Sequence, residues 1–301
     1  MSARSSYSCF SCFHLFLLVV LALFRLCSSN QDSHHDVERQ ALLRFKHGLT
    51  DESQRLASWV AENRDCCTWA GIACDNSTSH VHRIHLPGLD GHCRYQDYYF
   101  TIGEKEALMQ KLKGEISRSL LDLGSIPTDL KQLKHLDLSC NDFGGIQVPK
   151  FIGSFQNLRY LNLTHSNFSG TIPPQLGNLS ELHALSLGSF HDLYYERTSM
   201  VNMKWLSSLG MLHHFDMSGM DLSKATDWLQ WIFSVTSLVS LDLTQCYFHG
   251  PIPSFHNLTS LELLHVSMND FMNSSSIFQE LSSIFQELSS SNHLSGYVPE
   301  C

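Results

Sequence analysis

The sequence is poor in charge and has a deficit of positive charge. Charged residues make up 16% of the 301 residues, and 20 Lys and Arg stand against 29 Asp and Glu, which gives a net charge of −9. This deficit argues against a nucleic-acid-binding protein, because polyanions are repelled at neutral pH. Beyond the N-terminal region, no apolar run reaches the about 18 residues of a membrane span.

Common catalytic signatures are also missing. The chain has no Gly-x-Ser-x-Gly, no His-Glu-x-x-His and no phosphate-binding loop. We therefore expect a protein that is not an enzyme and that uses no cofactor or metal. Ten cysteines are many for a cytosolic protein and few for a disulfide-dense miniprotein.

Residues 1–29 have the pattern of a secretory signal peptide. Arg4 precedes a short apolar run that ends at Phe24, and the small residues Cys27, Ser28 and Ser29 follow. An uncleaved anchor or a buried helix are the alternatives. Cleavage leaves seven cysteines, and 18 basic against 29 acidic residues give a charge of −11. The odd cysteine count predicts at least one free or intermolecular thiol.

Repeated Leu-x-Leu pairs run through most of the chain. The strand anchors at positions 136, 161, 185, 215, 241 and 264 lie 23–30 residues apart, and an earlier copy starts at His80. Each pair puts two apolar side chains on one face of a short strand. One strand cannot bury them alone, so stacked copies predict a solenoid with a parallel sheet. An all-helical protein is the alternative, which the spacing disfavours.

Polar residues after the strands predict a ladder of side-chain hydrogen bonds. Asn141 and Asn269 can bond neighbouring backbone groups with their amides. Phe190 and Met220 occupy the same position in other copies and should interrupt the ladder. Aromatic or apolar residues two positions later predict a second buried column, formed by Phe143, Phe168, Leu222, Phe248 and Phe271. Residues 87–111 interrupt the first repeat.

The residues before the repeats predict an N-terminal cap. Asp36 can cap a helix from about Val37 to His47. Its predicted buried stripe is Val37, Ala41, Phe45 and Leu49, at four-residue spacing. Trp59 and Trp69 offer the apolar area to cover the open end of the leucine stack.

Three segments carry a resemblance to a known family: Glu38–Lys46, Leu56–Trp59 and Cys66–Cys74. Together with the Gly-x-Ile-Pro repeat endings, they resemble plant extracellular leucine-rich-repeat proteins, particularly receptor-like proteins of the disease-resistance type. The resemblance implies an α/β leucine-rich-repeat solenoid, a right-handed superhelix with its parallel sheet on the concave face. It implies a signal peptide at 1–29, a helical cap at 30–79 and about seven repeats at 80–301, the last ones degenerate and without a C-terminal cap.

The cysteines of the cap leave several pairings open. Cys67 and Cys74 close a short loop and are the expected disulfide. Relatives commonly pair the first cysteine of the double cysteine with one near the mature N-terminus, where this chain has none. Cys66 is then an orphan or pairs elsewhere, with Cys93 as one partner. A zinc site formed by Cys66, Cys67 and His34 or His35 is a minor alternative.

The resemblance implies a noncatalytic extracellular recognition protein that senses pathogen- or plant-derived protein or peptide ligands in defence signalling. It would work through a kinase partner and be secreted or lie on the extracellular face of the plasma membrane. A soluble inhibitor similar to polygalacturonase inhibitors is the alternative. Full-length receptor-like proteins carry more repeats, a membrane span and a tail, so a truncated or mispredicted gene product is a further interpretation.

Ligand binding is expected on the exposed strand positions. The acids there either line a ligand surface or keep it solvated. Five histidines, namely His135, His165, His183, His214 and His265, are predicted to face the same way. They suggest pH-sensitive binding in an acidic cell-wall space, with ordinary solvated histidines as the alternative. The candidate residues are His135, Asp137, Tyr160, Asn162, His183, Ser186, His214, Asp216, Asp242 and His265.

Six Asn-x-Ser/Thr sequons are candidate glycosylation sites and support passage through the secretory route. A glycan on Asn162 would obstruct part of the strand surface, whereas Asn76 ends the cap loop. The sequons are at Asn76, Asn162, Asn167, Asn178, Asn257 and Asn273.

Overall fold

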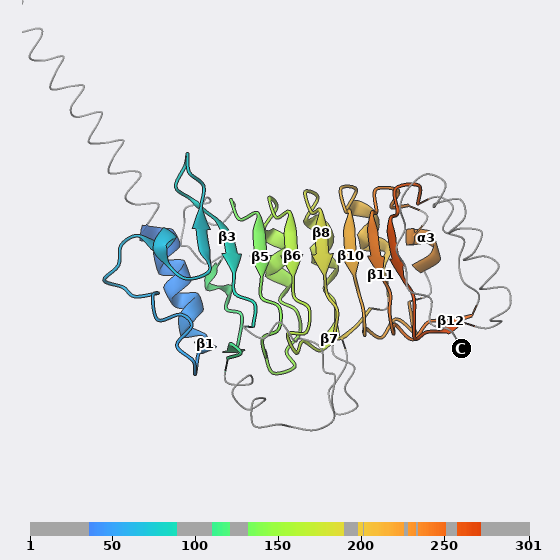
Figure 1. Ribbon diagram of the computed structural model, residues 1–301, viewed down its shortest axis with the longest axis horizontal. Coiled ribbons are helices and arrows are strands. Elements are labelled where there is room, and N and C mark those ends of the chain that lie inside the picture. The colour runs from blue at the N-terminus through green and yellow to red at the C-terminus, as the bar shows by residue number, and fades with distance from the viewer. Residues whose placement is uncertain are drawn as a thin grey trace, which may run out of the picture.

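A computed structural model describes most of the chain from residue 36 to residue 271. Strands stand side by side along the long axis of the molecule (Figure 1). The signal-peptide prediction at 1–29 and the residues His34, Cys93, Phe190, Asn257 and Asn273 lie outside the described residues. The described ranges are 36–88, 110–120, 132–189, 198–200, 202–225, 228–232, 234–250 and 258–271.

The main sheet has eight strands in the order β13-β11-β10-β8-β6-β5-β3-β2. All neighbours pair in parallel except β2 and β3, which are antiparallel. Every predicted strand anchor is the central residue of a strand, which confirms the leucine-rich-repeat solenoid. The strands are β2 (Ile72–Cys74), β3 (Val81–His85), β5 (His135–Asp137), β6 (Tyr160–Asn162), β8 (Ala184–Ser186), β10 (His214–Asp216), β11 (Ser240–Asp242) and β13 (Leu263–His265).

Register and burial explain why the short strands are stable together. Leu136 lies opposite Leu161, and Leu161 lies opposite Leu185. These three side chains are fully buried. A three-residue strand has few ladder hydrogen bonds of its own, so its stability comes from the apolar area that the next coil covers.

Short helices and strand pairs complete the coils away from the main sheet (Figure 1). Phe143 and Phe168 stack with ring centroids 5.1 Å apart, as the predicted second apolar column requires. The helical elements of the coils are η2 (Arg118–Leu120), η3 (Lys150–Ser154), η4 (Pro174–Asn178), η5 (Lys204–Ser208) and α3 (Trp228–Ile232), and the cap contains η1 (Cys66–Thr68). The additional strand pairs are β7 (Gly170–Thr171) with β9 (Thr198–Ser199), and β12 (His249–Gly250) with β14 (Asp270–Phe271). None of the described helices has the length and apolar character needed to cross a bilayer.

The predicted polar ladder forms at Asn141 and Asn269. The Asn141 amide nitrogen donates to the carbonyls of Leu86 and Leu138, at 2.8 Å each. Asn269 donates to Leu243 at 2.8 Å in the same way. Met220 is fully buried at the equivalent position and carries no group that could continue the ladder.

The interrupted first repeat is still a coil of the solenoid. Residues 110–120 return to the core, where Leu112, Ile116 and Leu120 are buried. Strand β4 (Lys113–Gly114) pairs with β1 (Leu49–Thr50) of the cap. Sequence inserted between β3 and this segment therefore leaves β3 and β5 direct neighbours in the sheet.

The cap helix covers residues 36–47, close to the predicted span. Its buried face differs from the prediction, because Val37 and Leu49 are only partly buried whereas Glu38 and Leu42 are fully buried. The Glu38 carboxylate accepts from the backbone N–H of Val81 at 3.1 Å. A hydrogen bond to the first repeat strand thus offsets the cost of burying an acid.

Two tryptophans form the predicted lid over the first repeat. Trp59 and Trp69 are almost fully buried and stack with centroids 5.4 Å apart. The Trp59 indole N–H donates to the carbonyl of Ala70 at 2.9 Å. An element that the sequence analysis did not foresee, β2, extends the main sheet into the cap.

The cysteine geometry settles the pairings within the cap. Cys67 and Cys74 form a disulfide, as expected. Cys66 is a free, buried thiol, which confirms the orphan alternative and makes the pairing with Cys93 wrong. The zinc alternative fails because Cys67 is committed to its disulfide. Burial raises the pKa of the Cys66 thiol to about 12, which makes it unreactive.

The structure also describes two cysteines of the repeats, Cys140 and Cys246. Cys246 is free and buried, and its thiol donates to the carbonyl of Met217 at 3.2 Å. Cys246 thus takes the place of the ladder asparagine with a weak donor. Cys140 is disulfide-bonded. The free thiols of Cys66 and Cys246 confirm that not every cysteine is paired.

Candidate functional site

The outward side of the main sheet, here called the strand face, presents its side chains in two columns. Strand register fixes both columns, because residues paired across the sheet stand next to one another. The first column is Arg83, His135, Tyr160, Ala184, His214, Ser240 and Leu263. The second column is His85, Asp137, Asn162, Ser186, Asp216, Asp242 and His265.

Polar side chains of the second column accept hydrogen bonds from the backbone just beyond the end of their own strands. The Asp137 Oδ1 atom accepts from the backbone N–H of Ser139 at 3.0 Å. The same bond to the residue two positions on is made by Asn162 at 3.0 Å, and by Asp216 and Asp242 at 2.9 Å. These side chains therefore have a structural role at the strand end, which the sequence analysis did not consider beside ligand binding and solvation.

Acids in this column also affect one another. Asp216 and Asp242 are neighbours across β10 and β11. Burial, followed by the charge of Asp242, raises the pKa of the Asp216 carboxyl, although hydrogen bonds from Ser218 oppose the shift. Asn162 makes the equivalent bond without a charge, so the capping function does not require an acid.

An aromatic pair dominates the N-terminal half of the first column. The His135 and Tyr160 rings stack with centroids 4.1 Å apart and an interplanar angle of 4°. The Asn162 amide donates to the Tyr160 hydroxyl at 3.2 Å. Desolvation and the charge of Arg83 lower the pKa of His135 to about 4. The stack is therefore an uncharged, partly apolar surface between pH 5 and 7.5.

The five candidate histidines do not form one row, so their predicted common orientation was wrong. His135 and His214 share the first column, whereas His265 lies in the second. His183 lies just before β8 and stacks on His213, with centroids 5.4 Å apart. His165 lies beyond the end of β6, with a φ of 55°. The histidines stand at different positions relative to the apolar anchor of their own strand, and that position decides the column.

Two imidazole–carboxylate pairs lie at opposite ends of the strand face. The Nδ1 atom of His85 is 3.3 Å from Oδ2 of Asp137, and that of His265 is 3.1 Å from Oδ2 of Asp242. Both pairs join second-column residues of adjacent strands. His85 was missing from the candidate residues, although aligning His80–Leu86 with the later copies puts it at the Asp137 position.

The remaining candidates occupy the middle of the strand face. Ser186 is half-buried on β8, and His214 is exposed on β10. The structure thus places His135, Asp137, Tyr160 and Asn162 in one contiguous group. His214, Asp216, Asp242 and His265 form a second group, and His183 lies outside both columns.

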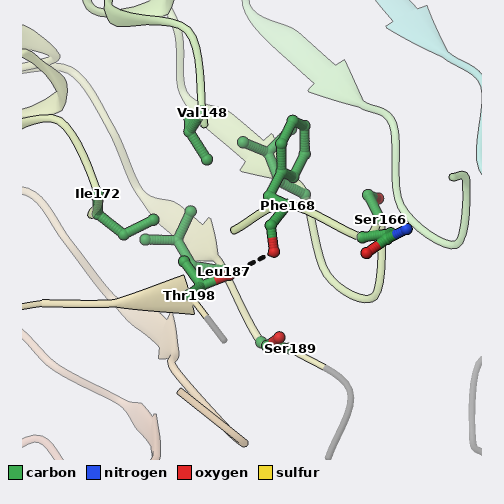
Figure 2. Close-up of a pocket in the computed structure, with 10 residues that line it drawn as sticks. Val148, Ser166, Phe168, Ile172, Leu187, Ser189 and Thr198 are labelled. Atoms are coloured by element: carbon green, nitrogen blue, oxygen red, sulfur yellow. Dashed lines mark hydrogen bonds between the residues drawn. The ribbon is translucent and has the colours of Figure 1, made fainter. Parts of the chain in front are cut away.

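The pocket shown in Figure 2 is not part of the strand face. It lies among residues of three coils, including Phe168, Ile172, Leu187 and Thr198. The Thr198 hydroxyl donates to the Phe168 carbonyl at 2.9 Å beside it (Figure 2). The enclosed space holds about one water molecule, which is too little for a ligand.

The described sequons differ in exposure. Asn76 and Asn178 are exposed, at the β2–β3 turn and at the end of η4. Asn162 and Asn167 are half-buried, and the Asn167 amide donates to Asp142 at 2.6 Å. Exposure favours Asn76 and Asn178 as glycan positions.

Comparison with known proteins matches two family descriptions to the chain. The description "Leucine rich repeat N-terminal domain" matches residues 35–75. The description "Leucine Rich Repeat" matches residues 132–154 and 157–179. The first match coincides with the cap and the second with two coils of the solenoid.

Several plant proteins are similar over most of the chain. Receptor-like protein EIX1 of Solanum lycopersicum is 35% identical over 275 residues, which cover 88% of this chain and 24% of EIX1. Receptor-like protein EIX2 of the same organism is 35% identical over 276 residues, with the same coverage. Receptor-like protein 6 of Arabidopsis thaliana is 29% identical over 282 residues. The chain spans about a quarter of the length of these relatives.

A solved structure supports the fold. The leucine-rich-repeat ectodomain of the Arabidopsis thaliana receptor kinase GASSHO1/SCHENGEN3 matches with a TM-score of 0.54 and 23% identity. The match covers 77% of this chain and 24% of that ectodomain. The chain therefore belongs to the leucine-rich-repeat family and is a relative of plant receptor-like proteins.

Proposed function

We propose that the chain is a noncatalytic recognition module of a receptor-like protein, acting on the extracellular side of the plasma membrane. Its strand face would bind a protein or peptide ligand, and a receptor kinase would carry the defence signal. The proposal rests on one observation above all: seven parallel strands, from β3 to β13, are in continuous register and hold rows of outward side chains in fixed positions. Such arrays are the extended binding surfaces of solenoid proteins.

The composition of the strand face suits a polypeptide ligand. The His135–Tyr160 stack offers a flat, partly apolar contact near the N-terminal end. Asp242 and His265 offer charge and hydrogen bonds near the other end. Aromatic anchors surrounded by polar groups are typical of protein interfaces. An extended segment lying across the strands would reach both groups.

The relatives support the assignment to extracellular recognition. EIX1 and EIX2 are receptor-like proteins. The GASSHO1/SCHENGEN3 ectodomain was solved in complex with Casparian strip integrity factor 2. By analogy we infer an extracellular ligand and a kinase partner for this chain. The signal-peptide pattern at 1–29, the disulfide of Cys67 and Cys74 and the exposed sequon at Asn76 fit a secretory route.

A displayed-peptide selection tests this proposal directly. The secreted chain selects binders from a random peptide library, and synthetic copies of the enriched sequences are then measured by calorimetry. A variant with Tyr160→Ala and His214→Ala should lose at least about tenfold in affinity. A control with Lys150→Ala and Gln175→Ala changes exposed residues of η3 and η4 and should bind normally.

Two results would overturn the proposal. One is binding that the control variant weakens as much as the strand-face variant does. The other is inhibition of a purified pectin-degrading enzyme by the chain, which would support the inhibitor function instead. The relatives named above are receptor-like proteins, and we find no feature of the described residues that favours the inhibitor.

A further inference from the structure

Three side chains with metal-binding groups meet at the N-terminal end of the strand face. His85 comes from β3, and His135 and Asp137 come from β5. One ligand atom from each lies within 4.8 Å of the other two. The Nδ1 atom of His85 is 3.3 Å from Oδ2 of Asp137. Two ligand atoms of a tetrahedral zinc site with bonds of about 2.1 Å are ~3.4 Å apart, so this pair already has the required spacing.

Two nitrogen atoms of the cluster have no hydrogen-bond partner among the described residues. They are Nδ1 of His85, whose approach to Oδ2 of Asp137 at 3.3 Å lacks hydrogen-bond geometry, and Nε2 of His135. Both atoms are shielded from solvent. Buried polar atoms in native proteins nearly always have a partner, and each exception calls for an explanation. An imidazole nitrogen is also the commonest protein ligand for transition metals. A bound metal ion would satisfy both atoms at once.

Neighbouring groups already hold the cluster in place. Oδ1 of Asp137 accepts from the backbone N–H of Ser139 at 3.0 Å and from its hydroxyl at 2.7 Å, while Oδ2 faces His85. The ring of His135 is fixed by its stack on Tyr160. Orienting contacts of this kind support the ligands of established metal sites.

We propose that His85, His135 and Asp137 form a binding site for a divalent transition-metal ion, with Zn²⁺ as the ion that fits best. Two imidazoles and one carboxylate match the three protein ligands of open zinc sites, which leave a fourth position for water or another molecule. The side chain of His85 is 41% exposed, which gives an ion access from the strand face. Arg83 stands beside His135 and its charge opposes a second cation, whereas the Asp137 carboxylate favours one.

The other end of the strand face provides a matched control. His265 and Asp242 form a second imidazole–carboxylate pair, with the atoms 3.1 Å apart. Ser240 precedes Asp242 by two residues, as His135 precedes Asp137, so the second imidazole is missing there. A pair alone should bind zinc much more weakly than the three-ligand cluster.

The test is calorimetric titration of the untagged, secreted chain with zinc chloride at about pH 7.5, because metal ions bind the deprotonated form of their ligands. We expect one tight site per chain, and at least about tenfold weaker binding in His85→Gln, His135→Gln and Asp137→Asn. His265→Gln should bind zinc as the wild type does. Asp137→Asn keeps the acceptor for Ser139, as Asn162 does for Thr164, so a loss of zinc binding there is not a loss of fold.

Cobalt substitution gives an independent reading of the coordination. The wild type should develop the intense visible absorption of four-coordinate Co²⁺, and His135→Gln should not. Absence of a tight zinc site in the wild type would refute the proposal. Equal weakening in His265→Gln and His135→Gln would also refute it, because binding would then be a general property of surface histidines.

Discussion

Asn141→Ala is the substitution that tests the ladder at its most buried point. The Asn141 side chain is fully buried and serves two coils at once. Its nitrogen donates to the carbonyls of Leu86 and Leu138, at 2.8 Å each. Its oxygen accepts from the backbone N–H of Leu112 at 3.0 Å and from the Arg55 guanidinium at 3.2 Å. Alanine removes all of these contacts and replaces none of them.

The expected cost follows from the groups left without a partner. The Leu86 carbonyl and the Leu112 N–H lose their partner in the interior, whereas the Leu138 carbonyl keeps its bond from the Ser166 hydroxyl. An unsatisfied buried group costs about 1–3 kcal/mol, so two groups set the loss of unfolding free energy at about 2–4 kcal/mol after partial relaxation. That is a large fraction of the about 5–15 kcal/mol of a typical domain.

Ser166→Ala is the matched control for this measurement. The Ser166 hydroxyl donates to the same Leu138 carbonyl at 2.7 Å, which would keep its bond from Asn141. We expect a loss of only about 1 kcal/mol. Urea unfolding followed by tryptophan fluorescence measures both variants, and hydrogen exchange of the Leu112 amide reports the lost bond locally. A loss below about 1 kcal/mol for Asn141→Ala, equal to that of Ser166→Ala, would refute the reasoning.

Three further predictions concern charge, the cap and the aromatic stack. Asp216→Asn should raise the thermal midpoint at pH 7 by about 2 °C, because the raised pKa of Asp216 means that its charge lowers the stability of the folded state. This cost disappears as the pH falls through that pKa, so scanning calorimetry near pH 3 should show no gain in the midpoint. A gain that persists near pH 3 would contradict the explanation. Replacing Cys67 and Cys74 with serine should lower the unfolding free energy of the cap by about 2–3 kcal/mol in denaturant titrations, whereas no change would mean that packing alone holds the loop. His135 should titrate near pH 4 by NMR. Tyr160→Ala should move the pKa of His135 towards the ordinary value, because water then reaches the imidazole ring. An ordinary pKa of His135 in the wild type would rule out this packing.

The fold was predictable because the leucine spacing carries it. All predicted strand anchors are central strand residues, from Leu136 to Leu264. The tryptophan lid and the disulfide between Cys67 and Cys74 were also expected, and both are present. Short-range patterns suffice here because each coil contacts only its neighbours.

The candidate site was predicted less well. Position in the repeat identified Asp137 and Asn162 as outward residues, but it did not reveal their bonds to Ser139 and Thr164. The histidines were assigned to one row by residue type, whereas the offset of each histidine from its own strand anchor decides its column. The omission of His85 came from the weak first copy, whose strand has no Leu-x-Leu pair.

The sequence by itself determined that leucine-anchored coils stack behind a cap, because a single short strand cannot bury its regularly spaced apolar side chains and stacked coils can. Tertiary structure alone decided which polar side chains meet, since contacts between coils join residues that lie far apart in the sequence. The bond of the buried Glu38 to Val81 depends on how the cap helix packs against β3, and the meeting of His85 with Asp137 depends on strand register across an insertion. Register is fixed by packing of the whole stack, and no local pattern contains it.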